Sequence, residues 1–278
     1  MPFDDSLKGM QTPERLYALC RLVHISPLSR EQLGRQFQPA HLNKSGDQLK
    51  ETLSLAEKGA LLAHDPQTGL YRSQLADEHL RNSEAFRTEL TRRIFSSPSS
   101  VFTRFTCWFL NRGASVLGEK SDALSQLFFQ EVTLQRNQER REYNDTNITA
   151  WKAWAAYFGL GYLHGETLVP NAAGRIHDLL RNGANLPVNR AIPFKMFMEW
   201  LAGRAPELDG GSANRLYNRV FADQRLSYAL SSGLRTLHDI GTLRLSYTAD
   251  AADVWYLTTN PAHAVKDRVS EIEIFVEG

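Results

Sequence analysis

One seven-residue pattern occurs twice in this chain, as Leu55-x-x-x-Gly59-x-Leu61 and as Leu237-x-x-x-Gly241-x-Leu243. In each copy an apolar stripe of helical spacing runs into a glycine, and residues that suit a β-strand follow. Glycine commonly ends a helix because it adopts the left-handed backbone conformation that a C-terminal cap requires. Each copy therefore predicts a helix that ends at the glycine and gives way to a β-hairpin.

The residues on either side of Gly59 predict three helices and a hairpin. Thr12 and Ser29 each precede a helical pattern as N-caps, and Ser29 stands three residues before Gln32, as a capping box requires. The expected helices span residues 12–24, 30–37 and about 45–58, and the expected strands span residues 60–64 and 70–73. This is the order of a winged helix, in which a β-hairpin called the wing follows the third helix.

The residues before and after Gly241 predict a second unit of the same kind. A short middle helix there is expected to turn Leu216 and Val220 inward. The expected helices span residues 193–201, 213–221 and 225–240, and strand 242–247 is expected to pair with strand 254–258.

The residues between these two units show helical patterns throughout. Expected helices cover residues 77–95, 101–110, 124–132, 148–158 and 172–180. We therefore expect a mainly α-helical protein with small β-wings, in which two winged-helix domains flank a helical middle domain. The expected boundaries are residues 1–75, 76–190 and 191–278.

The charge of the chain is balanced in every segment. The whole chain has 32 Lys and Arg against 31 Asp and Glu. Basic and acidic residues number 9 and 8 in residues 1–75, 14 and 12 in residues 76–190, and 9 and 11 in residues 191–278. A domain that coats DNA usually has a clear positive excess, because neutralising phosphates drives its affinity. The composition therefore favours protein interaction over extensive DNA coating.

Several classes of protein are disfavoured by what the sequence lacks. The two cysteines, Cys20 and Cys107, lie in apolar helical patterns, and no Cys-x-x-Cys zinc motif occurs. The eight histidines show no metal-ligand spacing, and neither a Walker loop nor a Gly-x-Ser-x-Gly elbow is present. An acidic start and the lack of a long apolar run predict a cytoplasmic protein. We expect no catalytic residues, no metal and no cofactor.

DNA contacts, if there are any, are expected on the third helix of each winged helix, which commonly enters the major groove. The helix expected over about residues 45–58 should turn polar side chains outward. The helix expected over residues 225–240 should also turn polar side chains outward, on a face that it shares with Asp239. The candidate nucleic-acid-binding residues are Lys44, Gln48, Lys50, Thr52, Arg225 and Arg235. Acidic residues share both helices and the second wing tip, where Asp250 and Asp253 would repel phosphate.

Two other motifs favour ordinary structural roles. The basic residues at 92–93 and 136–141 are candidates for a phosphate-facing patch. Glu139 and Glu142 are interleaved with Arg140 and Arg141, however, which is typical of a solvated helix with internal ion pairs. Gly159-x-Gly161 follows an aromatic helix rather than a strand, so it is better explained as a helix stop and turn than as a dinucleotide loop. Trp151 and Trp154 are expected in the core.

The layout resembles the DpdG-like family. The resemblance rests on Pro27 to Leu33 at the second helix, on the turn Glu207-Leu208-Asp209-Gly210-Gly211, and on Leu237 to Leu243. It implies an accessory component of bacterial islands that insert 7-deazaguanine bases into DNA and restrict unmodified DNA. No active site is implied by the resemblance.

The sequence patterns predict a binding protein rather than an enzyme, and the resemblance implies a non-catalytic adaptor of a bacterial DNA modification and restriction system that defends against phage. Its expected partners are other proteins of the same system, with double-stranded DNA as a further candidate ligand and no membrane. The alternative is a sequence-specific winged-helix transcription regulator, which would need two groove-facing helices about one turn of DNA apart.

Overall fold

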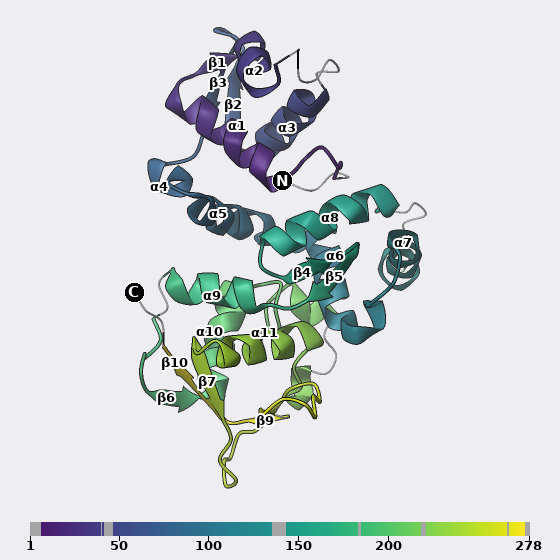
Figure 1. Ribbon diagram of the computed structural model, residues 1–278, viewed down its shortest axis with the longest axis vertical. Helices are drawn as coiled ribbons and strands as arrows, with labels where there is room; N and C mark the ends of the chain where they lie inside the picture. Colours follow the sequence, from purple (N-terminus) through teal and green to yellow (C-terminus); the bar gives the residue numbers. More distant parts are fainter. Residues whose placement is uncertain are drawn as a thin grey trace. The chain divides into compact units, whose positions relative to one another are not determined.

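The computed structural model describes residues 7–39, 41, 47–134, 143–182, 185–217, 221–265 and 267–275. The chain divides into two compact units. The first holds residues 1–102 and 121–157, and the second holds residues 103–120 and 158–278. The segment 76–190, expected to be helical throughout, is thus divided between the two units. Both units combine helices with small antiparallel sheets (Figure 1).

The first unit contains the elements that the sequence predicts for residues 12–73, followed by further helices. Its elements are α1 (Pro13–Ile25), β1 (Leu28–Ser29), α2 (Arg30–Phe37), α3 (Asp47–Lys58), β2 (Leu62–Asp65), β3 (Leu70–Ser73), α4 (Asp77–Leu80), α5 (Ser83–Phe95), the start of α6 (Val101–Arg112), α7 (Ser121–Phe128), the π-helical turn η2 (Phe129–Thr133) and α8 (Asp145–Tyr157). We call α1 to β3 the first module.

Side-chain hydrogen bonds at the N-caps fix where α1 and α2 of the first module begin. Thr12 accepts a hydrogen bond from the Arg15 amide, and Ser29 and Gln32 form the expected capping box. The strands form a sheet in the order β1-β3-β2, in which Leu28 pairs with Tyr71 and Leu62 with Ser73. The predicted helix positions and the hairpin are therefore confirmed.

The aromatic residues of α8 belong to the core of the first unit, as expected. Trp151 and Trp154 are fully buried. The Trp154 indole donates a hydrogen bond to the Gln11 carbonyl at 2.7 Å, and the Asn147 amide donates one to the Leu7 carbonyl at 2.7 Å. These bonds satisfy buried polar groups and fasten the segment that precedes α1.

The second unit has a longer series of elements. They are the rest of α6, η1 (Gly113–Val116), β4 (Gly161–His164), β5 (Thr167–Pro170), α9 (Ala173–Arg181), β6 (Ala191–Pro193), α10 (Phe194–Arg204), η4 (Asn214–Leu216), η5 (Phe221–Asp223), α11 (Tyr228–Asp239), β7 (Leu243–Ser246), β8 (Trp255–Tyr256), β9 (Arg268–Val269) and β10 (Glu271–Ile274). We call α9 to β10 the second module.

The two modules have the same sheet topology. The second sheet runs β6-β10-β7, which matches β1-β3-β2 strand for strand. Ile272 of β10 pairs with Ile192 on one side and with Leu245 on the other. The helix in the place of α1 is α9, which packs against α11 as α1 packs against α3. This helix lies in the segment expected to form the middle domain.

Three predictions for the second module are wrong. The strand expected over residues 254–258 does not pair with β7: β8 pairs with β9 instead, and β10 takes the central place. Of the helix expected over residues 213–221, the described residues 213–217 form only the short turn η4, and Leu216 is 62% exposed. Val220 lies outside the described residues. Strand β10 was missed although Glu271 to Ile274 alternate as a half-buried strand does.

The segment around Gly159 forms a hairpin that the sequence did not predict. Strands β4 and β5 pair from Gly161 with Pro170 to His164 with Thr167. Gly159 has a φ of +71°, and a Cβ there would meet the Gly174 backbone at 2.6 Å. Gly159 therefore allows close backbone packing next to a hairpin. Among the described helices, none is long and apolar enough to span a membrane.

Candidate functional site

The third helices of the two modules, α3 and α11, are structural equivalents. Both have twelve residues and start 181 positions apart, and the strands β2 and β7 that follow them are separated by the same interval. Each helix ends in a pair of hydrogen bonds in which the chain reverses. In α3 the amides of Leu61 and Ala60 bind the carbonyls of Ala56 and Glu57; in α11 the amides of Thr242 and Gly241 bind those of Leu237 and His238.

When the two helix ends are aligned by these hydrogen bonds, the alignment differs by one residue from the one that the repeated sequence pattern suggests. The left-handed residue at the end of α3 is Ala60, with a φ of 51°, and not Gly59 as predicted. In α11 it is Gly241, as predicted, with a φ of 79°. Ala60 therefore corresponds to Gly241, and the repeated sequence pattern is one position out of step with the structure.

Helix α3 turns a polar face to solvent. Lys50 is exposed and Gln48 is half-buried, so both remain candidate contacts. Thr52 is fully buried, and its hydroxyl donates a hydrogen bond to the Gln48 carbonyl at 2.7 Å, so the expectation that it points outward is wrong. Its position falls on the core stripe of the helix, three residues after Leu49. Lys44 lies outside the described residues.

Helix α11 is enclosed, contrary to the expectation of an outward polar face. Every residue of α11 except Asp239 is buried or half-buried. Arg235 is 5% exposed, and its guanidinium donates hydrogen bonds to the carbonyls of Thr258 at 2.7 Å and Val265 at 2.9 Å. Arg235 is thus committed to the protein itself. Arg225 is exposed and precedes the helix, with its guanidinium over the Tyr256 ring.

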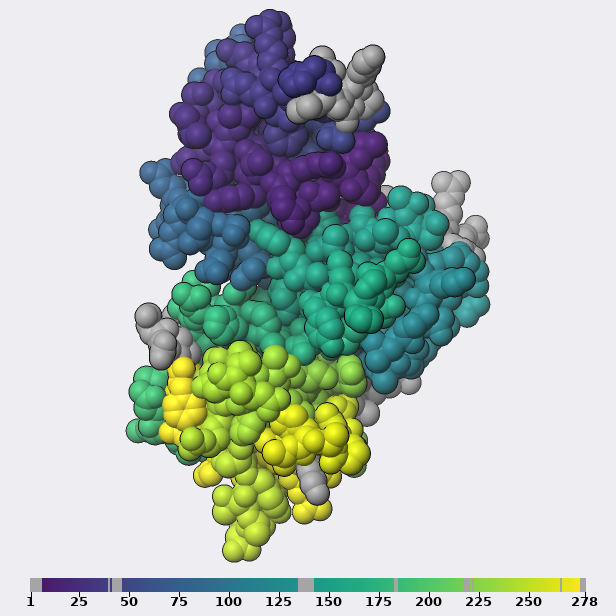
Figure 2. Space-filling view, in the orientation of Figure 1, coloured from purple at the N-terminus to yellow at the C-terminus, as the bar shows by residue number. Residues whose placement is uncertain are grey.

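The segment that encloses α11 is an insertion between β7 and β10, residues 247–270. The Ser231 hydroxyl accepts a hydrogen bond from the Thr258 amide at 3.0 Å, and His263 Nε2 lies 3.0 Å from the Asp239 carboxylate. Figure 2 shows the yellow spheres of this segment against the yellow-green surface of the same unit. Trp255 and Val269 are buried, so the insertion is part of the core.

The first module has only a short turn, residues 66–69, where the second has its insertion. Asp65 anchors this turn, accepting hydrogen bonds from the Thr68 hydroxyl at 2.8 Å and the Gln67 amide at 2.9 Å. These bonds lower the pKa of Asp65, chiefly the one from Thr68. This turn therefore holds a negative charge, which disfavours a phosphate backbone.

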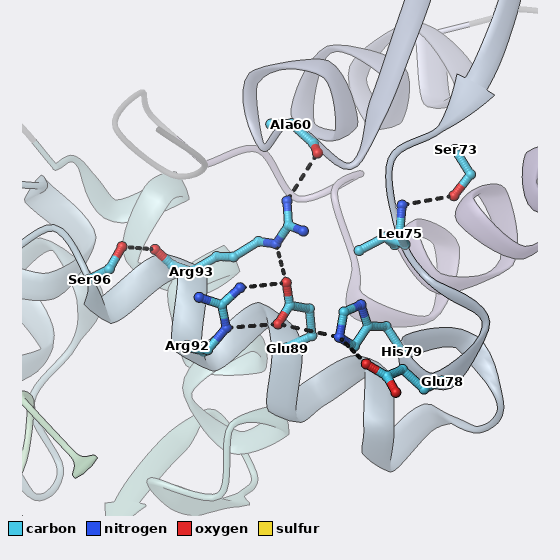
Figure 3. A network of polar contacts seen from close by, with 9 residues as sticks. All are labelled: Ala60, Ser73, Leu75, Glu78, His79, Glu89, Arg92, Arg93 and Ser96. Atoms are coloured by element: carbon cyan, nitrogen blue, oxygen red, sulfur yellow. Dashed lines mark hydrogen bonds and ion pairs between the residues drawn. The ribbon is translucent and has the colours of Figure 1, made fainter.

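Of the basic residues considered as a phosphate patch, Arg92 and Arg93 bind a carboxylate. Figure 3 shows Glu89 held between them. Arg92 donates two hydrogen bonds of 2.8 Å to Glu89, and Arg93 donates one of 2.5 Å. Burial raises the pKa of Glu89, but the hydrogen bonds and charges of both arginines outweigh it and lower that pKa. This confirms the expected internal ion pairing; residues 136–141 lie outside the described residues.

The segment Glu207 to Gly211 is buried in the second unit, where it binds a residue of α9 and the N-cap residue of α11. Arg175 donates a hydrogen bond of 2.6 Å to the fully buried Glu207 carboxylate. The Asp209 carboxylate accepts from both the amide and the hydroxyl of Ser227, the N-cap of α11. A Cβ at Gly211 would meet the Ala205 carbonyl at 2.3 Å. The segment fixes where α11 begins.

A further polar contact links α11 to the strand that follows it. His238 accepts a hydrogen bond from the Leu245 amide at 3.1 Å, and burial lowers its pKa. No group of three His, Cys, Asp or Glu in the described parts is placed to hold a metal ion. What distinguishes the two modules is therefore the open face of α3 against the enclosed face of α11.

Two three-helix modules, each closed by a three-stranded antiparallel sheet, define this protein as mainly helical with small β-structure. The model of the DpdG-like family matches residues 8–251, so the chain belongs to the DpdG-like family. Membership connects it with the DpdG-related modification system. No curated protein and no solved structure matches the chain.

Proposed function

We propose that this protein is a non-catalytic winged-helix adaptor of a bacterial system that modifies DNA with 7-deazaguanine bases and restricts unmodified DNA. The helix order and the sheet orders β1-β3-β2 and β6-β10-β7 support a winged helix in each module. Family membership supports the system in which it works. Its partners are other proteins of that system, in the cytoplasm.

The observation that carries the adaptor role is the difference between α3 and α11. Because α11 is enclosed, it serves a structural role, and so does the second module. The exposed face of α3 is open to solvent, and its charged residues, Asp47, Lys50, Glu57 and Lys58, are balanced. Protein interfaces accept such mixed charge, whereas DNA affinity grows with the number of neutralised phosphates.

The test combines two binding measurements on the full chain. Size-exclusion chromatography of the purified protein with each protein of its modification system is expected to give co-elution with at least one. A gel shift with duplex DNA is expected to be weak and not sequence-specific. Specific binding with a steep salt dependence, without co-elution, would instead establish the transcription regulator.

A further inference from the structure

The second module shows how a helix in the position of α3 holds a polypeptide segment. Ser231 and Arg235 lie one helical turn apart, and they bind the two backbone groups of the same residue. The Ser231 hydroxyl accepts from the Thr258 amide, and the Arg235 guanidinium donates to the Thr258 carbonyl. Two side chains of α11 thus take the amide and the carbonyl of one residue.

The segment held in this way is extended and continues from a strand. Tyr256 of β8 pairs with Arg268, and the Leu257 amide binds the Asp267 carbonyl. On the other side, the Leu226 amide binds the Tyr256 carbonyl. Backbone contacts of this kind recognise an extended chain largely independently of its side chains.

The constant interval of 181 residues gives the matching positions on α3. Ser231, Arg235 and His238 form a strip with helical spacing, and they correspond to Lys50, Ser54 and Glu57. The first strip is buried or half-buried beneath the insertion. On α3, Lys50 and Glu57 are exposed and Ser54 is half-buried, because the first wing has only residues 66–69 at this place. We call Lys50, Ser54 and Glu57 the α3 strip.

We propose that the α3 strip binds an extended segment of a partner protein, in the way that α11 binds residues 256–258 of its own chain. This rests on the proposed adaptor function and names the surface and the class of ligand. Lys50 donates to a backbone carbonyl of the segment, as Arg235 does on α11. The Ser54 hydroxyl accepts from a backbone amide, as the Ser231 hydroxyl does, so the donor and the acceptor stand in the opposite order along the helix. Glu57 selects a segment with a Lys or Arg beside it and disfavours nucleic acid.

The experiment places a photoreactive benzoylphenylalanine at position 57 of the full chain, made in cells together with the other proteins of its system. The control has the same group at position 18, where Ala18 is exposed on α1. Position 57 is expected to crosslink to one short stretch of one partner, and position 18 is not. Lys50→Glu and Ser54→Trp are each expected to lower the affinity for that partner by about tenfold or more, and Ala18→Trp to leave it unchanged.

Four results would overturn the inference. A nuclease-sensitive crosslink at position 57 would show nucleic acid on the strip. Crosslinks scattered over many proteins would show non-specific contact. Co-elution with a partner but no crosslink specific to position 57, or equal affinity of the strip variants, would leave the adaptor function standing and place the partner elsewhere. Melting temperatures of the variants within the range of Ala18→Trp exclude loss of folding as the cause.

Discussion

The guanidinium of Arg93 donates a hydrogen bond of 3.0 Å to the carbonyl oxygen of Ala60. Arg93 belongs to α5 and Ala60 follows α3, so the bond ties α5 to the point where the chain passes from α3 into β2 (Figure 3). Ala60 has a φ of 51°, which costs a residue with a Cβ roughly 1–2 kcal/mol. Burying Leu61, the next residue, contributes about 1.5–3 kcal/mol and offsets this strain.

Because Ala60 is strained, Ala60→Gly is expected to stabilise the protein by about 0.5–1 kcal/mol. Gly241→Ala places the same strain in the second module and is expected to destabilise it by about 1 kcal/mol. Thermal unfolding measures both. Gly203→Ala is the control, since Gly203 lies in α10 with open space around it and the change is expected to be neutral or stabilising. Loss of stability in Ala60→Gly would contradict the left-handed cap.

The two helix ends also show how far the sequence predicts this fold. Local signals sufficed for α1, α2, α3 and the first hairpin, because caps and apolar spacing act within one turn. The signal for Thr52 was present as well: it shares a stripe with Leu49, Leu53 and Ala56, and only its hydroxyl suggested an outward position.

What the sequence did not predict depends on contacts between distant residues. Strand β10 pairs with β6 about eighty positions earlier, and nothing local favours that pairing over a hairpin with residues 254–258. The burial of Arg235 likewise follows from the path of the insertion, since both carbonyls that it binds lie on that segment. Candidate contacts on α11 therefore could not be judged from helical spacing alone.

Glu89 is expected to make stability depend on pH in the acid range. Its pKa is lowered in the folded protein from an ordinary value of 4.5, so its contribution is complete above about pH 4.5 and is lost as the pH falls through the folded value. Glu89→Gln is expected to destabilise the protein by about 1–3 kcal/mol at pH 7. The difference from the parent should shrink below pH 4.5 in unfolding curves taken across pH.

The control for this experiment is Glu119→Gln, because Glu119 is exposed. It is expected to change stability by less than about 0.5 kcal/mol at every pH. A Glu89→Gln difference that stays constant from pH 7 to pH 3 would show that the carboxylate charge is not what the two arginines stabilise.

Arg235 is expected to hold the insertion rather than a nucleic acid. Arg235→Met leaves the carbonyls of Thr258 and Val265 without their donor, so we expect a loss of about 1–3 kcal/mol and faster hydrogen exchange at the Thr258 amide. Arg225→Met removes an exposed cation over the Tyr256 ring and is expected to cost about 0.5–1 kcal/mol. Unchanged exchange at Thr258 in Arg235→Met would separate Arg235 from the insertion.

The buried pair of Arg175 and Glu207 is expected to be the most sensitive polar contact of the second unit. The Arg175 guanidinium also donates to the Arg204 carbonyl at 3.3 Å, and Asn214 donates to the Glu207 carbonyl at 2.9 Å. Glu207→Ala leaves a buried guanidinium without its carboxylate and is expected to cost about 3–5 kcal/mol. The pair of exposed Arg244 and half-buried Glu273 gives the comparison, and Arg244→Ala is expected to cost less than about 1 kcal/mol.

A double variant separates two effects on the free energy of unfolding: the loss caused by an unpaired buried charge and the net contribution of the ion pair. Arg175→Met combined with Glu207→Leu removes both charges and keeps similar volume, so we expect it to be more stable than Glu207→Ala alone. Chemical unfolding of the single and double variants gives the comparison. If Glu207→Ala costs no more than Arg244→Ala, the pair does not hold the segment from Glu207 to Gly211. The placement of α11 would then depend on the bonds between Asp209 and Ser227 alone.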